Sequence, residues 1–217
     1  MDQSALSLTL YYDEPRLKMS LVGRIFVRVV TYVSYLFLIA TALTFILSDI
    51  VWLKAAGALL LLWVVDLMLH WREADRTISE APRAGRLNLM RVMAPATFAI
   101  IERSFERSSL TRRNFFLDLT LQLVGVRSVQ TALKDAQVDP VKFRDKVEEF
   151  AMIPEESPRG AVARYAAAEE LVIQAGREAI LRTRRFILPE DLFSALFEVK
   201  DPMIERILGL FFEPRHN

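Results

Sequence analysis

The stretch "RRFILPEDLFSALFEVKDPMIERILG", from Arg184 to Gly209, decides the fold of the C-terminal half of the chain. It contains two helix starts, Pro-Glu-Asp at 189–191 and Asp-Pro at 201–202. Proline is favoured in the first turn of a helix, and aspartate is favoured just before it. Apolar residues at helical spacing follow each start. The stretch therefore predicts two short helices, about 189–198 and 202–212.

The same pattern occurs once more, 75 residues earlier in the chain. At an offset of 75, without a gap, apolar positions coincide: Leu117 with Leu192, Leu121 with Leu196, Val124 with Val199, Val129 with Ile204, and Ala136 with Phe211. Internal repeats of this kind are typical of tandem helical units. We therefore expect an all-α domain with two repeats, 93–152 and 161–217, joined by a linker at 153–160 and related by an approximate twofold axis.

Each repeat should contain one longer helix followed by short ones. We expect helices at about 94–108, 112–124 and 126–136, with a fourth starting at Asp139-Pro140, and in the second repeat at about 161–183, 189–198 and 202–212. Leu192, Leu196 and the Ile204 face should be buried. Glu190 and Asp191 open a short helix, so we expect both to face solvent.

Charged residues are nearly absent from one segment near the N-terminus. Between Val29 and Trp71 only Asp49, Lys54 and Asp66 are charged, out of 55 charged residues in the chain. The 20 residues from Val29 to Ser48 carry no charge, and an uncharged run of this length can cross a bilayer as a helix. We predict a transmembrane hairpin over 29–71, with spans at about 29–48 and 51–71 in contact with lipid. Residues 1–28 are expected to be a cytoplasmic segment, and residues 72–92 a juxtamembrane linker.

Basic residues flank the predicted hairpin and are scarce in its loop. Arg16, Lys18, Arg24 and Arg28 precede the first span and several arginines follow the second, whereas the loop offers only Lys54. The positive-inside rule then predicts that both termini are cytoplasmic and that the protein resides in the cell (inner) membrane. Asp66 lies near the cytoplasmic end of the second span, and we interpret it as a structural residue rather than a proton relay.

A family resemblance rests on "FILPEDLFSALFEVKDPMIERILG" and on the alanine-rich stretch upstream, "AAAEELVIQAGREAILRTRRFILPEDL". These segments resemble the Clp N-terminal repeat, whose domain contains two tandem repeats in front of AAA+ unfoldases. Glu190 matches the family's glutamate, and Asp191 stands where histidine is usual. In the first repeat, Phe115 and Phe116 stand at the two corresponding positions, so no acid is present there. The helix expected after Pro214 has no counterpart before the chain ends at Asn217.

The resemblance implies a protein-binding module that does no chemistry itself. Its expected partners are an AAA+ ATPase, an adaptor or an unfolded substrate, in protein quality control. Arg184 and Arg185 lie beside Glu190 and Asp191, and we take these four residues as the candidate protein-binding site. Two alternative functions remain open. The chain could be the N-terminal part of a longer membrane-anchored Clp-type ATPase, or a non-recruiting scaffold whose hairpin forms a homo-oligomer.

The sequence lacks the motifs of several other functional classes. It has no phosphate-binding loop, no Gly-x-Ser-x-Gly elbow and no His-Glu-x-x-His pair, so we expect no enzyme activity and no cofactor. It has no cysteine and two histidines, which argues against a metal site of thiolates or imidazoles. The net charge of +1 gives no reason to expect binding to nucleic acid.

Overall fold

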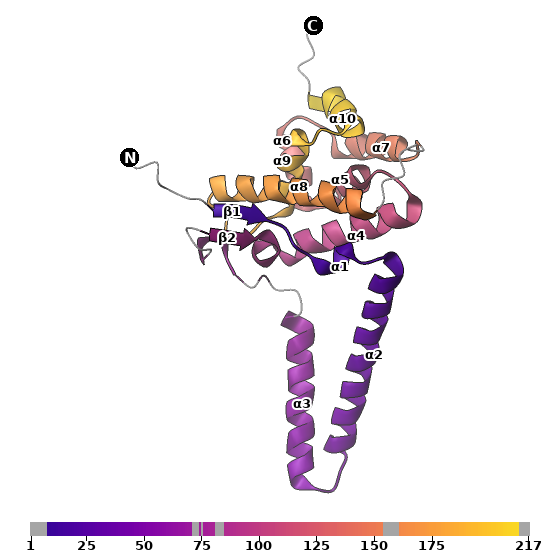
Figure 1. The fold of residues 1–217 in the computed structure, drawn as a ribbon, viewed down its shortest axis with the longest axis vertical. Helices are drawn as coiled ribbons and strands as arrows, with labels where there is room; N and C mark the ends of the chain where they lie inside the picture. The colour runs from indigo at the N-terminus through magenta and orange to yellow at the C-terminus, as the bar shows by residue number, and fades with distance from the viewer. Residues whose placement is uncertain (1–7, 71–73, 75, 81–84, 154–160, 213–217) are drawn as a thin grey trace, which may run out of the picture. The chain divides into compact units, whose positions relative to one another are not determined.

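The computed structural model describes residues 8–70, 74, 76–80, 85–153 and 161–212. Within these residues the chain is mostly helical, as predicted, with ten α-helices and one pair of short strands (Figure 1). It divides into two units. We call Met1–Lys18 together with Ala74–Asn217 the helical body, and we call Met19–Glu73 the hairpin unit.

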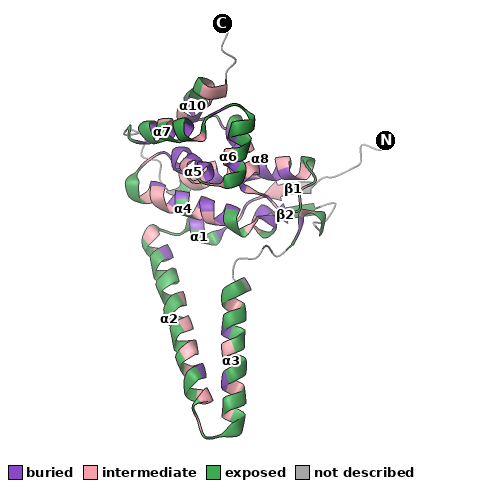
Figure 2. Ribbon diagram, turned by 180° about the vertical axis from the view of Figure 1, so that it is seen from behind, coloured by how far each residue is buried: buried purple, intermediate pink, exposed green. Residues whose placement is uncertain are grey.

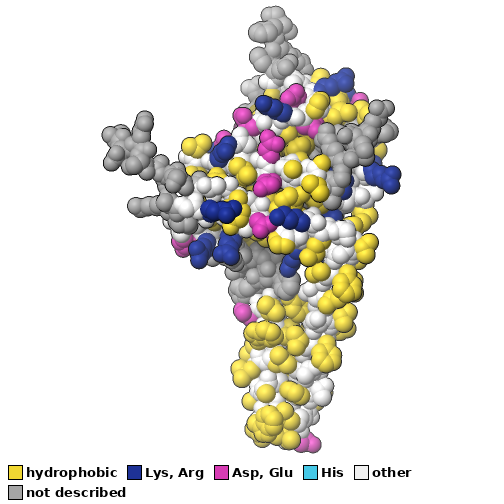
Figure 3. All heavy atoms as spheres, in the orientation of Figure 1, with side chains coloured by type: hydrophobic (Ala, Val, Ile, Leu, Met, Phe, Trp, Pro, Cys, Tyr) yellow, Lys and Arg dark blue, Asp and Glu magenta, His cyan; other side chains and the backbone are white. Residues whose placement is uncertain are grey.

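The hairpin unit consists of two helices, α2 (Leu21–Ile46) and α3 (Val51–His70). Helix α2 begins after Ser20, whose hydroxyl accepts a hydrogen bond from the Gly23 N–H at 3.1 Å. Both helices are long and apolar enough to cross a membrane, as their sequence predicted. Most of their side chains are exposed, and the surface of this unit is largely apolar (Figures 2 and 3).

Small residues allow the two helices of the hairpin to approach each other closely. A Cβ atom added to Gly57 of α3 would lie 2.6 Å from the carbonyl oxygen of Ala42 in α2 and 2.8 Å from Cβ of Phe45. Ala42 and Val64 are fully buried between the helices. Close backbone contact at glycine and alanine is the usual basis of helix association in lipid, where the hydrophobic effect between helices is absent.

The helical body contains the two strands, eight of the helices and three short 3₁₀ segments. In chain order these are β1 (Leu8–Tyr11), α1 (Pro15–Lys18), η1 (Ile78–Glu80), β2 (Gly85–Asn88), η2 (Leu89–Val92), α4 (Pro95–Thr111), α5 (Phe115–Val124), α6 (Arg127–Asp135), α7 (Pro140–Ala151), α8 (Ala161–Leu181), α9 (Pro189–Ala195), η3 (Leu196–Glu198) and α10 (Pro202–Phe212). Strands β1 and β2 pair in parallel, with Leu8 opposite Gly85 and Tyr11 opposite Asn88.

The segment before the hairpin is fastened to helix α8 by Tyr165. Its hydroxyl donates to the Tyr12 carbonyl at 2.9 Å and accepts from the Glu14 N–H at 3.3 Å. The rings of Tyr12 and Tyr165 are stacked, with centroids 6.0 Å apart. Leu17 is buried in the same core. Residues 8–18 are therefore an integral part of the helical body.

The structure divides the chain differently from the boundaries expected at 1–28 and 72–92. Residues 8–18 and the described residues of 74–92 belong to the helical body, whereas residues 19–28 belong to the hairpin unit, because α2 already begins at Leu21. Leu89 and Val92 are core residues. The Ile187 N–H donates to the Val92 carbonyl, so this supposed linker is bonded to the second repeat. Its apolar residues form only a short pattern, Leu87, Leu89, Met90 and Val92, which is too brief to identify a helix or a long strand from the sequence.

The helices of the two halves follow the offset of 75 found in the sequence. Helix α5 corresponds to α9 with η3, and helix α6 corresponds to α10. One boundary was predicted wrongly, because Arg112 does not begin a helix. It adopts a left-handed backbone (φ 56°) that ends α4, and α5 begins after Asn114, whose side chain accepts from the Phe116 N–H. Whether the two halves superpose as a true duplication stays a prediction.

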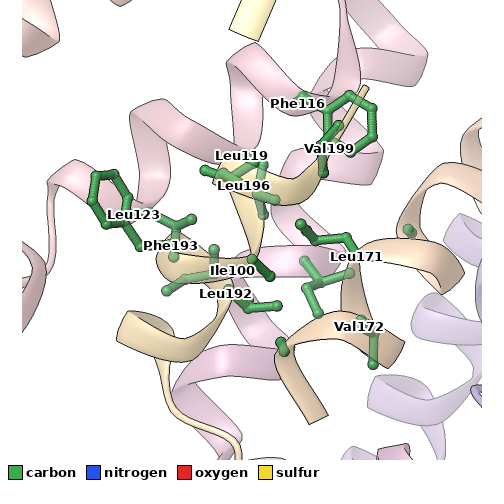
Figure 4. Close-up of a cluster of buried hydrophobic side chains, with 14 of the residues drawn as sticks. Ile100, Phe116, Leu119, Leu123, Leu171, Val172, Leu192, Phe193, Leu196 and Val199 are labelled. Carbon is green, nitrogen blue, oxygen red and sulfur yellow. The ribbon is translucent and has the colours of Figure 1, made fainter. Parts of the chain in front are cut away.

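A buried apolar cluster joins the two repeats at the centre of the helical body (Figure 4). It contains side chains from α4, α5, α8, α9 and η3, and from Val199, which follows η3: Ile100, Phe116, Leu119, Leu123, Leu171, Val172, Leu192, Phe193, Leu196 and Val199. Leu192, Leu196 and Ile204 are buried, as predicted. Each repeat therefore depends on the other for its core.

Replacing Leu196 by alanine tests this shared core. Leu196 is 1% exposed, so the truncation should lower the free energy of unfolding of the helical body by about 2–5 kcal/mol. Leu181→Ala is the matched control, because Leu181 is 79% exposed and should change stability by less than about 0.5 kcal/mol. Denaturant unfolding followed by circular dichroism measures both. Equal effects of the two substitutions would contradict the packing described.

Candidate functional site

The candidate residues lie around the turn that joins α8 to α9. Helix α8 ends in a turn in which Thr183 has a left-handed backbone (φ 52°) and the Arg184 N–H donates to the Ala179 carbonyl at 2.9 Å. This 6→1 hydrogen bond is the mark of a Schellman ending. It reverses the chain so that Arg184 meets the first turn of α9.

Arg184 pairs with both acids at the start of α9. Its Nη1 lies 3.0 Å from Oε1 of Glu190, and its Nε lies 3.0 Å from Oδ1 of Asp191. Nη1 of Arg182 adds a longer contact with Asp191, at 3.7 Å. Arg185 does not join this network. It is exposed, and its guanidinium lies over the ring of Phe186.

The prediction that Asp191 faces solvent is wrong, because this side chain is fully buried. Asp191 is the third residue of its helix, and its Oδ2 accepts the N–H of Leu188, the residue just before the helix, at 2.9 Å. The carboxylate thereby satisfies a backbone donor that the helix itself leaves open. Glu190 is half-buried. Of the four predicted residues, the structure therefore brings three into one network and leaves Arg185 outside it.

A related ion pair exists in the first repeat, and sequence reasoning missed it. Nε of Arg107 in α4 lies 3.2 Å from Oδ1 of Asp118 in α5, and Asp118 is fully buried. Arg107 and Arg182 are separated by 75 residues, whereas Asp118 and Asp191 are separated by 73. The repeated arginine was therefore a detectable signal, but the shift of two residues between the aspartates concealed the pair.

Two hydrogen bonds between the repeats link helix starts reciprocally. The hydroxyl of Ser128 in α6 donates to Oε2 of Glu190 in α9 at 2.9 Å. The Asn114 amide at the start of α5 donates to Oδ2 of Asp201 at the start of α10, at 3.0 Å. Since α5 corresponds to α9 and α6 to α10, the two bonds are equivalent under exchange of the repeats. This reciprocity is what an approximate twofold arrangement requires.

Burial sets the electrostatics of the two aspartates. It raises the pKa of Asp118, although Arg107 and Arg113 oppose the rise. Burial also raises the pKa of Asp191, against the opposing effects of the Leu188 N–H and Arg184. Both carboxylates are committed to arginines inside the domain, so the arrangement is suited to holding helices together. Among the described residues, no three acidic or histidine side chains form a group that could hold a metal ion.

Comparison with protein-family models, curated proteins and solved structures finds no significant match to this chain. The resemblance to the Clp N-terminal repeat therefore rests on the residues quoted from the sequence, and it stays a prediction.

The raised pKa of Asp118 predicts a specific pH dependence. The folded state retains the proton more strongly than the unfolded chain, so stability from this group is present at acidic pH and is lost as pH rises through the folded pKa. The free energy of unfolding of Asp118→Asn, measured relative to that of wild type, should therefore increase between about pH 4 and about pH 7, because only the wild type loses the contribution of this carboxyl group. Unfolding titrations at the two pH values measure the difference.

Asp145→Asn is the control for this experiment, because it removes one carboxylate from an exposed position on α7. A relative stability of Asp118→Asn that is unchanged with pH, or that moves the opposite way, would contradict the account of the buried carboxylate.

Proposed function

We propose that the protein is a membrane-tethered protein-binding module that recruits substrates, adaptors or a Clp-type ATPase to the cytoplasmic face of the membrane. One observation carries the proposal: the segments on both sides of an apolar helical hairpin fold into a single helical body. A hairpin built this way holds its domain at the bilayer surface through two chain connections.

The shared core also constrains the topology. Leu17 precedes the hairpin and Leu89 follows it, and both belong to one hydrophobic core. If α2 and α3 cross the membrane, the two flanks must therefore lie on the same side of it. The excess of basic residues in these flanks over the single Lys54 of the loop favours the cytoplasmic side. This excess supports the proposal of a cytoplasmic helical body.

An aromatic cluster on α7, η3 and α10 offers a surface for protein contact. The ring of buried Phe143 lies 5.1 Å from Phe211 and 6.1 Å from Phe212, and Phe212 lies 5.0 Å from Phe197. Phe197 is 45% exposed, while Phe211 and Phe212 are partly buried. Aromatic residues that remain accessible on a packed surface are enriched where proteins bind one another.

The cluster supports recruitment better than the ion-pair network does. Glu190 is bonded to Arg184 and Ser128, so a charge reversal there would break internal contacts as well as any contact with a partner. The alternatives are the N-terminal part of a longer membrane-anchored Clp-type ATPase, and a scaffold that recruits nothing. Phe197 distinguishes recruitment from the scaffold.

Capture of an unfolded protein tests the proposal. The full chain reconstituted in neutral-lipid nanodiscs should bind a permanently unfolded reporter protein, and Phe197→Ser should weaken binding at least about fivefold, since loss of an aromatic contact residue costs more than 1 kcal/mol. Leu181→Ser is the matched control, because it removes an exposed apolar side chain from α8. Fluorescence anisotropy of the labelled reporter measures the affinity.

Failure of the unaltered protein to bind the reporter and any purified Clp-type ATPase would contradict the recruiter function and favour the scaffold. Equal loss of binding in the two serine variants would show that the aromatic cluster is not the contact surface.

A further inference from the structure

One methionine of the helical body is exposed and has its sulfur held by an arginine. Nη2 of Arg113 lies 3.3 Å from Sδ of Met152, so the guanidinium donates a hydrogen bond to the thioether. Met152 is 60% exposed. Arg113 lies in the turn between α4 and α5, and Met152 is the residue at which α7 ends. The contact therefore joins the segment before α5 to the end of α7.

The other described methionines of the helical body lie in its core or against it. Met93 is 2% exposed, and Met90 and Met203 pack on the buried cluster. Oxidation turns a flexible apolar methionine into a polar sulfoxide, which disrupts a core. Met152 differs from these three residues, because solvent reaches its sulfur and a polar product there stays outside the core.

A thioether is a weak acceptor for a charged donor. Sulfur accepts hydrogen bonds poorly, whereas bonds from a guanidinium to oxygen are short and strong. The carboxylate of Glu149, which precedes Met152 in α7, is bonded to Nζ of Lys146 at 2.8 and 2.9 Å. The oxygen of a sulfoxide at Met152 would therefore give Arg113 a better acceptor than the sulfur it now contacts.

We propose that Met152 is a site of reversible oxidation by hydrogen peroxide and that Arg113 holds the resulting sulfoxide. The sulfur lone pair attacks one peroxide oxygen, an S–O bond forms and the O–O bond breaks. The second oxygen takes up the proton of the first and leaves as water, so the sulfur loses two electrons and the peroxide gains them. Sulfoxide reductases return the thioether.

The expected effect on the fold is the reverse of the usual one. Methionine oxidation commonly loosens a structure, because a polar group enters an apolar contact. At Met152 it should instead strengthen the contact between the start of α5 and the end of α7. Arg113 and Met152 both belong to the helical body, so this effect does not depend on the membrane anchoring proposed above.

Hydrogen exchange of the full chain in neutral-lipid nanodiscs, before and after mild treatment with hydrogen peroxide, tests the proposal. Peptide mass spectrometry should find Met152 oxidised well before Met93. Protection of the amides of residues 115–118 and 150–153 should then rise roughly two- to fivefold, which is the gain expected from one charge-assisted contact at an exposed position.

Three variants assign the effect to this pair of residues. Arg113→Gln leaves a shorter, uncharged side chain and should abolish the gain in protection while Met152 is still oxidised. Arg112→Gln is the matched control, because it removes the same charge from the exposed neighbouring position and should behave as wild type. Met152→Leu removes the sulfur, so peroxide should leave these amides unchanged.

Three results would overturn the proposal. The first is oxidation of Met152 that is no faster than that of Met93. The second is protection that is unchanged or reduced when the wild type is oxidised. The third is an equal gain in protection in Arg113→Gln or in Met152→Leu, which would place the effect at another methionine or at another donor.

Discussion

Parallel strands cannot be joined by a tight turn, and the pairing of β1 with β2 therefore requires a long crossover. In this protein the crossover contains the whole apolar hairpin, since α2 and α3 lie between the two strands in the chain. An ordinary crossover helix packs back on its own sheet, whereas these two helices form a separate unit. The strand pair thus fixes where the chain leaves the helical body and where it returns.

Residues of the second repeat, in α8 and in the turn after it, hold both segments that flank the hairpin. The Tyr165 hydroxyl of α8 forms hydrogen bonds with the backbone of Tyr12 and Glu14, before the hairpin. After the hairpin, the backbone of Ile187 forms hydrogen bonds with the backbone of Val92 and Ala94. The described segments on both sides of the hairpin are therefore hydrogen-bonded to residues of the second predicted repeat. If the hairpin spans a membrane as proposed, a partner bound to the helical body would be held near the bilayer, and such concentration in a plane favours multivalent capture.

Much of this fold could be predicted because its signals are local. A run without charge indicated the hairpin, and aspartate-proline pairs indicated the starts of α7 and α10. Asp139 and Asp201 both accept backbone N–H groups at those starts. The strands could not be predicted in the same way. Each has four residues, and Leu8 pairs with Gly85 across the hairpin. The alternation of Leu8, Thr9 and Leu10 was a signal for β1 that sequence reasoning missed, whereas the Gly-Arg-Leu-Asn of β2 carries no such pattern.

The candidate site was predicted less well than the fold. Glutamate and aspartate in a first helical turn usually interact with solvent and the helix dipole, yet Asp191 turns inward to Leu188 and Arg184. Its burial depends on how α8 and α9 pack, which no local pattern encodes. The two adjacent arginines looked alike in sequence, but the turn at Thr183 directs Arg184 to the acids and leaves Arg185 on the surface.

The most direct test of the account is a disulfide across the strand pair. Thr9 and Arg86 are both exposed and lie opposite each other in the parallel register, and the chain has no native cysteine. Neighbouring strands place Cα atoms within the range that a disulfide can bridge. Thr9→Cys combined with Arg86→Cys should form an intramolecular bond under mild oxidation in the membrane-reconstituted protein, detected by mass spectrometry of digested peptides. Thr9→Cys combined with Arg144→Cys on α7 should not. Absence of the bond in the first pair, or equal bonding in both, would contradict the claim that one helical body joins the two ends of the hairpin.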